Sequence, residues 1–221
     1  MAHNRVNRSA RAAAAHTATR PPTIRLVFIS VPAETFEVVF VCTGNRFRSP
    51  LAAAIFRQAV APLPVEVSSL GTLDLRTEGA LPEAVALGRE WGVDLREHRS
   101  AVLREADLSQ VDLVIGFEHA HVIAAAMEGR SRRERTFTLP ELVSLLERVG
   151  RPVADDALDT GQRRLDLAAG LRPTDPLQIG QPELEDPLGL PATGQRRIAE
   201  VIDDLTRRLA ESLFGLERDG M

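Results

Sequence analysis

Short apolar runs alternate with longer amphipathic segments along most of the chain. The run FEVVFVC (36–42) is short and rich in valine and phenylalanine, which is typical of a strand buried in a parallel sheet. Three later runs predict a second, third and fourth strand: VEVSSLGT (65–72), VDLVIGF (111–117) and RTFTLP (135–140).

The segments between these runs predict helices. Ser49 and Pro50 form a good helix start with Ser49 as the N-cap, and Leu51, Ile55 and Ala59 then fall on one face. Further helices are expected over residues 81–93, 118–127, 141–149 and 192–214. Strands that alternate with helices in this way predict an α/β fold, a three-layer sandwich in which a four-stranded parallel sheet is flanked by helices.

Two segments interrupt this rhythm. Residues 1–35 show no sustained periodicity, so we expect a disordered or loosely attached N-terminal extension, followed by one domain over residues 36–221. Within the domain, residues 150–190 hold five prolines and five glycines. They predict a long loop with one short helix near GQRRLDLAAGL (161–171).

The composition narrows the classes of function. The 221 residues carry a net charge of −4 and show no basic stripe interleaved with aromatic residues, so nucleic acid binding is not expected. All 27 basic residues are arginines, which excludes lysine Schiff-base chemistry. No apolar run approaches the roughly 18 residues of a membrane-spanning helix, and the N-terminus lacks the apolar core of a secretion signal. A cytoplasmic location without membrane association fits these features best.

Cys42 is the only cysteine and stands where the first strand passes into a glycine turn ahead of a helix. A single cysteine cannot form an internal disulfide, and no spacing typical of zinc ligands is present, so no metal is expected. The thiol is either a small core residue or a reactive group. Backbone N–H groups in such a turn and the following helix N-terminus would bind an anion and would also stabilise a nucleophilic thiolate.

The residues after Cys42 suit the same chemistry. Arg48 offers a planar guanidinium group that can bind two oxygens of a tetrahedral oxyanion. Gly44 lets the backbone approach the anion closely, and Asn45 can hold an unusual loop conformation through hydrogen bonds to the backbone. Ser49 has two candidate roles, capping the helix or donating a hydrogen bond to the thiolate, and the pattern favours capping.

VFVCTGNRFRSPLAAAIFR (39–57) resembles the phosphate-binding loop of the low-molecular-weight protein tyrosine phosphatase family, which has protein-arginine phosphatase and arsenate reductase relatives. The pattern of that loop is Cys-x5-Arg-Ser-Pro after the first strand. Four further segments resemble motifs of the family: SSLGT (68–72), GVDLREHRSAVL (92–103), VDLVIGFEHAH (111–121) and EDPLG (185–189). The resemblance therefore spans roughly residues 36–214.

The resemblance implies a role for each matching position. Cys42 would be the nucleophile, Arg48 the phosphate-binding arginine and Asp186 the general acid. Asn45 would shape the loop and Ser49 would support the thiolate. The remaining substrate-binding positions would be Thr43, Gly44, Arg46, Phe47 and Leu188.

The implied reaction has two steps. The Cys42 thiolate attacks phosphorus while Asp186 protonates the leaving atom, and a water activated by Asp186 then hydrolyses the phosphocysteine. Asp175, in a second Asp-Pro-Leu triplet, is the alternative acid, but its distance to the last helix fits the family less well. No metal or other cofactor is needed. The expected partners are a phosphorylated protein, with phosphotyrosine first and a tyrosine kinase among the candidates, and phosphate or other tetrahedral oxyanions.

Three positions depart from the family pattern. Arg46 replaces an apolar residue at the rim of the loop, where protein-arginine phosphatases carry threonine. Leu188 stands where an aromatic residue usually forms one wall of the slot, and Phe47 stands in place of a second loop cysteine. His119 and His121, which open a predicted helix, are expected to be partly exposed.

Two other functions remain open at this point. One is an arsenate reductase, which would depend on an external small thiol because the chain lacks the further cysteines of an internal thiol relay. The other is a non-catalytic phosphate-binding module, which the departures at Arg46 and Leu188 prompt.

Overall fold

The computed structural model describes residues 35–75, 77–150, 156–173 and 183–216. They contain a four-stranded sheet with the order β2-β1-β3-β4, in which each neighbouring pair is parallel. The strands are β1 (Phe36–Cys42), β2 (Val65–Gly71), β3 (Leu113–Gly116) and β4 (Thr136–Thr138). The predicted α/β fold with a four-stranded parallel sheet is confirmed.

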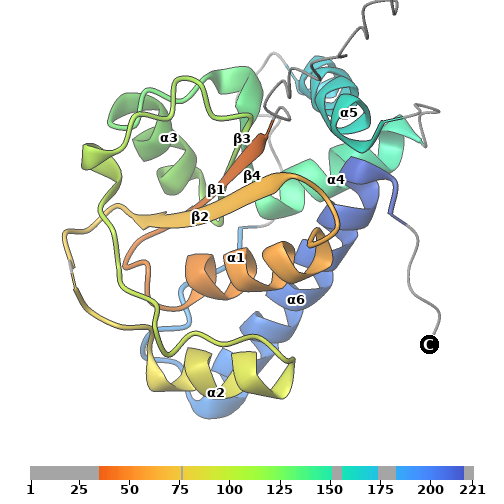
Figure 1. Cartoon of the computed structure of the whole chain (residues 1–221). Helices are drawn as coiled ribbons and strands as arrows, with labels where there is room; N and C mark the ends of the chain where they lie inside the picture. Colours follow the sequence, from red (N-terminus) through yellow and green to blue (C-terminus); the bar gives the residue numbers. More distant parts are fainter. Residues whose placement is uncertain (1–34, 76, 151–155, 174–182, 217–221) are drawn as a thin grey trace, which may run out of the picture. The chain divides into compact units, whose positions relative to one another are not determined.

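Helical segments connect consecutive strands, as parallel pairing requires. Figure 1 shows α1 and α6 on one side of the sheet and α3 on the other. The helices are α1 (Arg48–Ala59), α2 (Pro82–Glu90), α3 (His119–Met127), α4 (Leu139–Val149), α5 (Ala157–Leu171) and α6 (Ala192–Phe214). Two 3-10 helices, η1 (Leu103–Glu105) and η2 (Arg133–Arg135), lie in the connections.

Side chains alternate along β1 between two separate cores. Val38, Phe40 and Cys42 point into the larger core, which also receives apolar residues of α1, α4, α5 and α6. Val39 and Val41 point into a smaller core on the opposite face, which includes residues of η1 and α3. Because both faces of β1 are covered, its sequence is almost continuously apolar.

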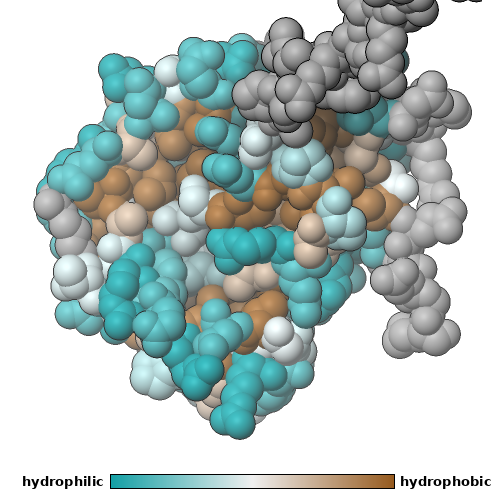
Figure 2. All heavy atoms as spheres, viewed as in Figure 1, coloured by the Kyte–Doolittle hydropathy of each residue, from teal (hydrophilic) through white to brown (hydrophobic). Residues whose placement is uncertain are grey.

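A third apolar cluster joins α1 to α2. Leu51 and Ile55 of α1 pack with Ala84 and Leu87 of α2. Figure 2 shows apolar surface along β2 and between α1 and α2, surrounded by hydrophilic residues. This packing fixes the chain segment before α2 beside the loop that follows β1.

Helix α1 begins at Arg48, two residues earlier than the sequence predicted. Phe47 is its N-cap residue, and no side-chain hydrogen bond caps the helix there. Ser49 therefore lies inside the first turn, and its predicted role as N-cap is wrong. Its hydroxyl group instead bonds within the loop that precedes the helix.

Helix α5 covers residues 157–171, so the short helix predicted near residues 161–171 is confirmed and begins four residues earlier, at Ala157. The Asp156 carboxylate caps it by accepting from the N–H groups of Leu158 and Asp159, at 2.8 and 3.0 Å. Leu165 and Ala168 are buried in the larger core. The rest of the predicted loop is described only in part, because residues 151–155 and 174–182 lie outside the described residues, as do residues 1–34 of the predicted extension.

Candidate active site

The loop between β1 and α1 borders a small pocket of about 110 Å³. Eight residues that the sequence singled out line it: Cys42, Thr43, Gly44, Arg46, Phe47, Arg48, Asp186 and Leu188. The other two, Asn45 and Ser49, are fully buried beside Cys42. Leu73, Leu75 and Leu81 complete the walls, and nothing in the sequence pattern marked them beyond their apolar character.

The Cys42 thiol has two hydrogen-bonding neighbours. The Asn45 backbone N–H donates to Sγ at 3.2 Å, and Ser49 Oγ lies 3.0 Å from Sγ. Asn45 Nδ2 donates to the same Ser49 oxygen at 2.9 Å, so the Ser49 hydroxyl hydrogen points to another group. Its two possible acceptors are Cys42 Sγ at 3.0 Å and the Leu70 carbonyl oxygen at 3.4 Å. The hydroxyl group therefore donates to Sγ, which is the nearer of the two. These two contacts fix the position of Sγ at the edge of the pocket.

Asn45 holds the loop in a left-handed turn with φ +51°. Asparagine tolerates this conformation because its short side chain can hydrogen-bond locally. Nδ2 also donates to Ser69 Oγ at 2.8 Å, and Oδ1 accepts from the Ala101 N–H at 3.0 Å. His98 Nε2 donates to the Asn45 carbonyl at 2.7 Å, and burial lowers the pKa of this histidine. Strand β2 and the 98–101 segment thus both hold Asn45 in place.

Gly71, at the end of β2, lies against the back of the same loop. A Cβ atom at this position would lie 3.0 Å from Asn45 Cβ and 3.1 Å from the Thr43 carbonyl oxygen. Both contacts are tighter than side chains normally make, and one of them is to backbone. Only glycine therefore lets the loop after β1 lie this close to β2.

The Arg48 guanidinium group is buried, and each of its two Nη atoms donates two hydrogen bonds. Nη1 donates to the Leu184 carbonyl at 2.9 Å and to Glu118, and Nη2 donates to Asp186 Oδ2 at 2.7 Å and to Thr43 Oγ1 at 3.3 Å. The side chain is only 2% exposed. Glu118 and Asp186 thus share one buried cation, Arg48. Together the three side chains carry one net negative charge, which would repel a bound anion.

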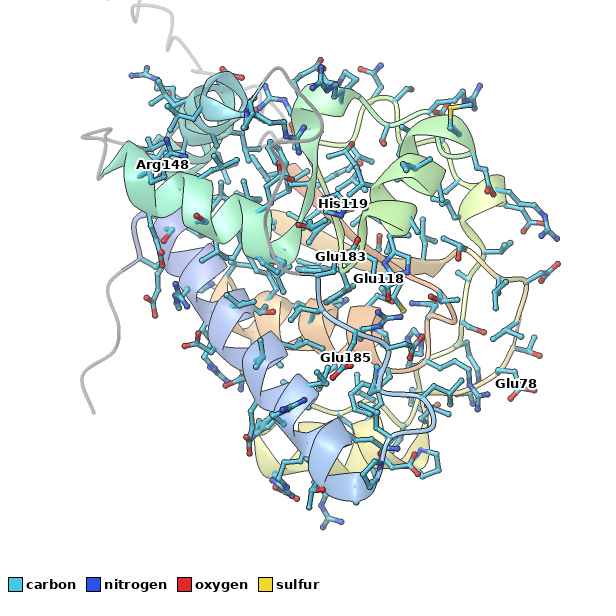
Figure 3. All side chains as sticks on the ribbon, turned by 180° about the vertical axis from the view of Figure 1, so that it is seen from behind. Glu78, Glu118, His119, Arg148, Glu183 and Glu185 are labelled. Carbon is cyan, nitrogen blue, oxygen red and sulfur yellow. The ribbon has the colours of Figure 1, made fainter. Side chains whose placement is uncertain are left out.

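Glu118 was missed from the sequence. It directly precedes α3 and follows β3, whose carboxyl end lies beside that of β1. The available signal was its position, because the carboxyl ends of neighbouring parallel strands converge on one edge of the sheet. Figure 3 shows Glu118 close to Glu183 and His119.

His121 is buried, so the expectation that it is partly exposed is wrong. Its Nδ1 accepts from the backbone N–H groups of Phe117 and Glu118 at 3.3 and 3.1 Å. Burial, and next the Arg48 charge, lower the pKa of His121 to about 4. The ring is therefore neutral with its hydrogen on Nε2, which donates to Thr43 Oγ1 at 3.0 Å. His121 thereby fixes the hydroxyl group of a residue that lines the pocket.

Asp186 and Leu188 lie on the chain segment that leads to α6. The Asp186 side chain is 43% exposed, and its second oxygen accepts from the Leu188 N–H at 3.0 Å. The leucine is 71% exposed and lines the pocket wall. Asp175, the alternative acid, lies outside the described residues.

The sequence left open whether the Phe47 side chain faces the core or the pocket. It is 5% exposed and packs into the cluster that joins α1 to α2, while one side lines the pocket. The residue is therefore a part of the core as well as of the site.

Comparison with known proteins agrees with this geometry. Residues 37–165 match the family model described as low molecular weight phosphotyrosine protein phosphatase. The chain belongs to this family. A protein-arginine-phosphatase of Bacillus subtilis is 36% identical over 110 residues, covering 49% of this chain and 73% of the relative. A low molecular weight protein-tyrosine-phosphatase of Streptomyces coelicolor is 38% identical over 97 residues, covering 41% of this chain and 57% of the relative.

Solved structures of the phosphatase family show the same fold. The low molecular weight protein tyrosine phosphatase from T. tengcongensis has a TM-score of 0.59 at 28% identity, covering 81% of this chain and 100% of that one. A mutant of the YwlE arginine phosphatase with a phosphorylated active site serine has a TM-score of 0.59 at 25% identity, covering 83% of this chain and 97% of that one.

The family match includes most of the candidate site but stops before its last segment. Cys42, Arg48 and Glu118 fall within the matched residues 37–165, whereas Asp186 lies beyond them. Among the described residues, no group of three or more His, Cys, Asp or Glu side chains could hold a metal ion. Nor is any described helix long and apolar enough to cross a membrane.

Proposed function

We propose that the protein is a cysteine-dependent phosphatase that removes phosphate from a phosphorylated protein side chain through a phosphocysteine intermediate. The observation that carries this proposal is the position of the Cys42 thiol. It lines a small pocket, receives hydrogen bonds from the Asn45 amide and Ser49, and has the buried Arg48 and the partly exposed Asp186 beside it.

In the proposed first step, the Cys42 thiolate attacks phosphorus in line and the bond from phosphorus to the leaving oxygen or nitrogen breaks. Asp186, protonated from solvent once it has left Arg48, gives this proton to the leaving atom. The loop N–H groups and Arg48 hold the other phosphate oxygens. In the second step Asp186 takes a proton from water, which attacks phosphorus and frees the thiolate and inorganic phosphate.

Asp186 has to leave Arg48 before it can serve as the acid. Its Oδ2 now lies 2.7 Å from Nη2, a position that a phosphate oxygen would take. A phosphate dianion would replace the carboxylate and push it away, because the two negative charges repel each other. The side chain is partly exposed, so it is able to turn towards a leaving group at the pocket mouth.

Phosphotyrosine is the first candidate substrate, because the description of the matching family names it. A cytoplasmic tyrosine kinase is a candidate partner for the same reason. Phosphoarginine is the second, because Leu73, Leu75, Leu81 and Leu188 give the pocket aliphatic walls, and Phe47, the one aromatic residue among the described lining residues, is only 5% exposed. A protein-arginine-phosphatase is also among the most similar relatives. Those relatives are named as phosphatases, which favours hydrolysis over the arsenate reductase alternative.

A substrate panel tests the proposal. Phosphotyrosine, phosphoarginine and phosphoserine peptides are incubated with the protein and with Cys42→Ser, and arsenate is offered with an external small thiol. We expect phosphate release from the first or second peptide and its loss in the variant. Arsenate reduction without hydrolysis would establish the reductase, and phosphate binding without turnover would establish a binding module.

A further inference from the structure

Arg46 stands on the rim of the pocket in a fixed place. Its backbone carbonyl accepts from the Leu81 N–H at 2.8 Å, and its Nε donates to the Gly79 carbonyl at 2.8 Å. The side chain lines the pocket and is 30% exposed. The segment before α2 thus holds both the backbone and the stem of this residue.

The outer end of the Arg46 guanidinium group is held only loosely. Its Nη2 lies 3.5 Å from Glu78 Oε2, which is longer than the 2.7–2.9 Å typical of charge-assisted hydrogen bonds. Glu78 is 58% exposed, and it is the only described carboxylate within 4 Å of this guanidinium group. Water screens such a pair, so another carboxylate can replace Glu78 at little cost.

Charge differs between the two sides of the pocket mouth. Arg46 lies on the side formed by the loop before α2, where Figure 3 labels Glu78. On the segment that leads to α6, Asp186 faces the pocket, while Glu183 pairs with His119. An acidic group on the substrate would therefore be attracted on the Arg46 side and repelled on the Asp186 side.

We propose that Arg46 recognises an acidic group next to the phosphorylated side chain, and that Glu78 occupies its place in the free protein. The preferred substrate class is then an acidic phosphopeptide in one orientation, with the carboxylate on one flank of the phosphorylated residue. This inference rests on the proposed phosphatase function.

The test uses three phosphotyrosine peptides that differ only beside the phosphorylated residue: asparagine on both flanks, aspartate before it, or aspartate after it. We expect one aspartate peptide to show a kcat/KM about threefold to fivefold above the asparagine peptide, through KM. Arg46→Gln should remove this difference. Glu78→Gln should increase it, because the aspartate no longer competes with Glu78.

Arg104→Gln is the matched control, because Arg104 also pairs with a carboxylate, Asp74, but does not line the pocket. It should leave the preference unchanged. Equal kcat/KM for all three peptides would overturn the inference, and so would an equal loss on all of them in Arg46→Gln, which would mean that Arg46 binds the phosphate itself.

Binding of the same peptides to Cys42→Ser separates this inference from the proposed function. An Arg46-dependent preference in binding, without turnover in the unmodified protein, would support the inference and refute the phosphatase. Turnover without any preference would support the phosphatase and refute the inference. A protein that neither binds nor hydrolyses the peptides would overturn both.

Discussion

Three side chains around Cys42 each make at least two hydrogen bonds, so the loop is held in shape before any ligand arrives. Asn45 bonds to Ser49, Ser69 and Ala101, Ser49 bonds to Asn45 and Cys42, and Arg48 bonds to four groups. Preorganised donors of this kind need no rearrangement when charge develops on an oxyanion. Of the side chains at the site, that of Asp186 has to move before a phosphate group can bind to Arg48.

Asp186→Asn tests that movement. Loss of the general acid should lower kcat on a phosphotyrosine peptide by about 10² to 10⁴. Inorganic phosphate should inhibit this variant at least as strongly as the unmodified protein, because the Asp186 carboxylate no longer competes for Arg48. Steady-state kinetics with phosphate as inhibitor measures both quantities.

Glu185→Gln is the control for this substitution. Glu185 is the neighbouring residue and pairs with Arg197 at the surface, so neither quantity should change. An unchanged kcat in Asp186→Asn would assign the acid role to another residue.

His121 should make the fold sensitive to acid. Burial and Arg48 depress its pKa to about 4, whereas the nearby Glu118 and Asp186 partly oppose that shift. Below the ordinary histidine pKa of about 6.5 the unfolded chain binds a proton that the folded chain refuses, so stability falls as pH decreases towards 4. Between pH 7 and 5 this histidine should account for a loss of about 2 kcal/mol.

Urea unfolding at pH 7 and pH 5 measures this contribution in the unmodified protein and in His121→Gln. The variant should lose less stability between the two values, whatever its stability at pH 7. His98→Gln offers a comparison, because the pKa of His98 is lowered in the same direction by burial. An equal loss in His121→Gln and in the unmodified protein would show that His121 titrates normally.

Among the elements, α5 begins four residues before the short helix predicted near residues 161–171. Gly161 and Gly170 both lie in this helix and have different roles there. A Cβ at position 161 would lie 2.8 Å from the Phe214 ring, so glycine lets α5 approach α6. At position 170 nothing lies within 4 Å of the corresponding point. The sequence could not separate these cases, since close packing depends on a partner 53 residues away, at position 214.

The two glycines provide a matched test. Gly161→Ala should reduce the free energy of unfolding by about 1–3 kcal/mol, because the methyl group overpacks the contact with Phe214. Gly170→Ala should be neutral or stabilising by up to about 1 kcal/mol, because alanine favours the helix. Chemical denaturation measures both. Equal effects of the two substitutions would contradict the packing of α5 on α6.

At the scale of the whole molecule, the site combines segments that are far apart in sequence. Cys42 to Ser49 are contiguous, so strand, turn and helix start could be predicted together with their chemistry. Glu118 and His121 could not, because their contacts depend on the strand order that places β3 beside β1. The sequence pattern favoured capping for Ser49, which is wrong because the helix begins two residues earlier than predicted, at Arg48. The contact with sulfur that the resemblance implied for Ser49 is present.

The central claim is that Cys42 carries the phosphoryl group during turnover. Rapid acid quenching of the protein with a phosphotyrosine or phosphoarginine peptide, followed by mass spectrometry of the fragment that contains Cys42, tests it most directly. We expect a phosphoryl group on Cys42 and no turnover in Cys42→Ser. Phosphate release that continues in Cys42→Ser, or a phosphoryl group on another residue, would contradict the claim.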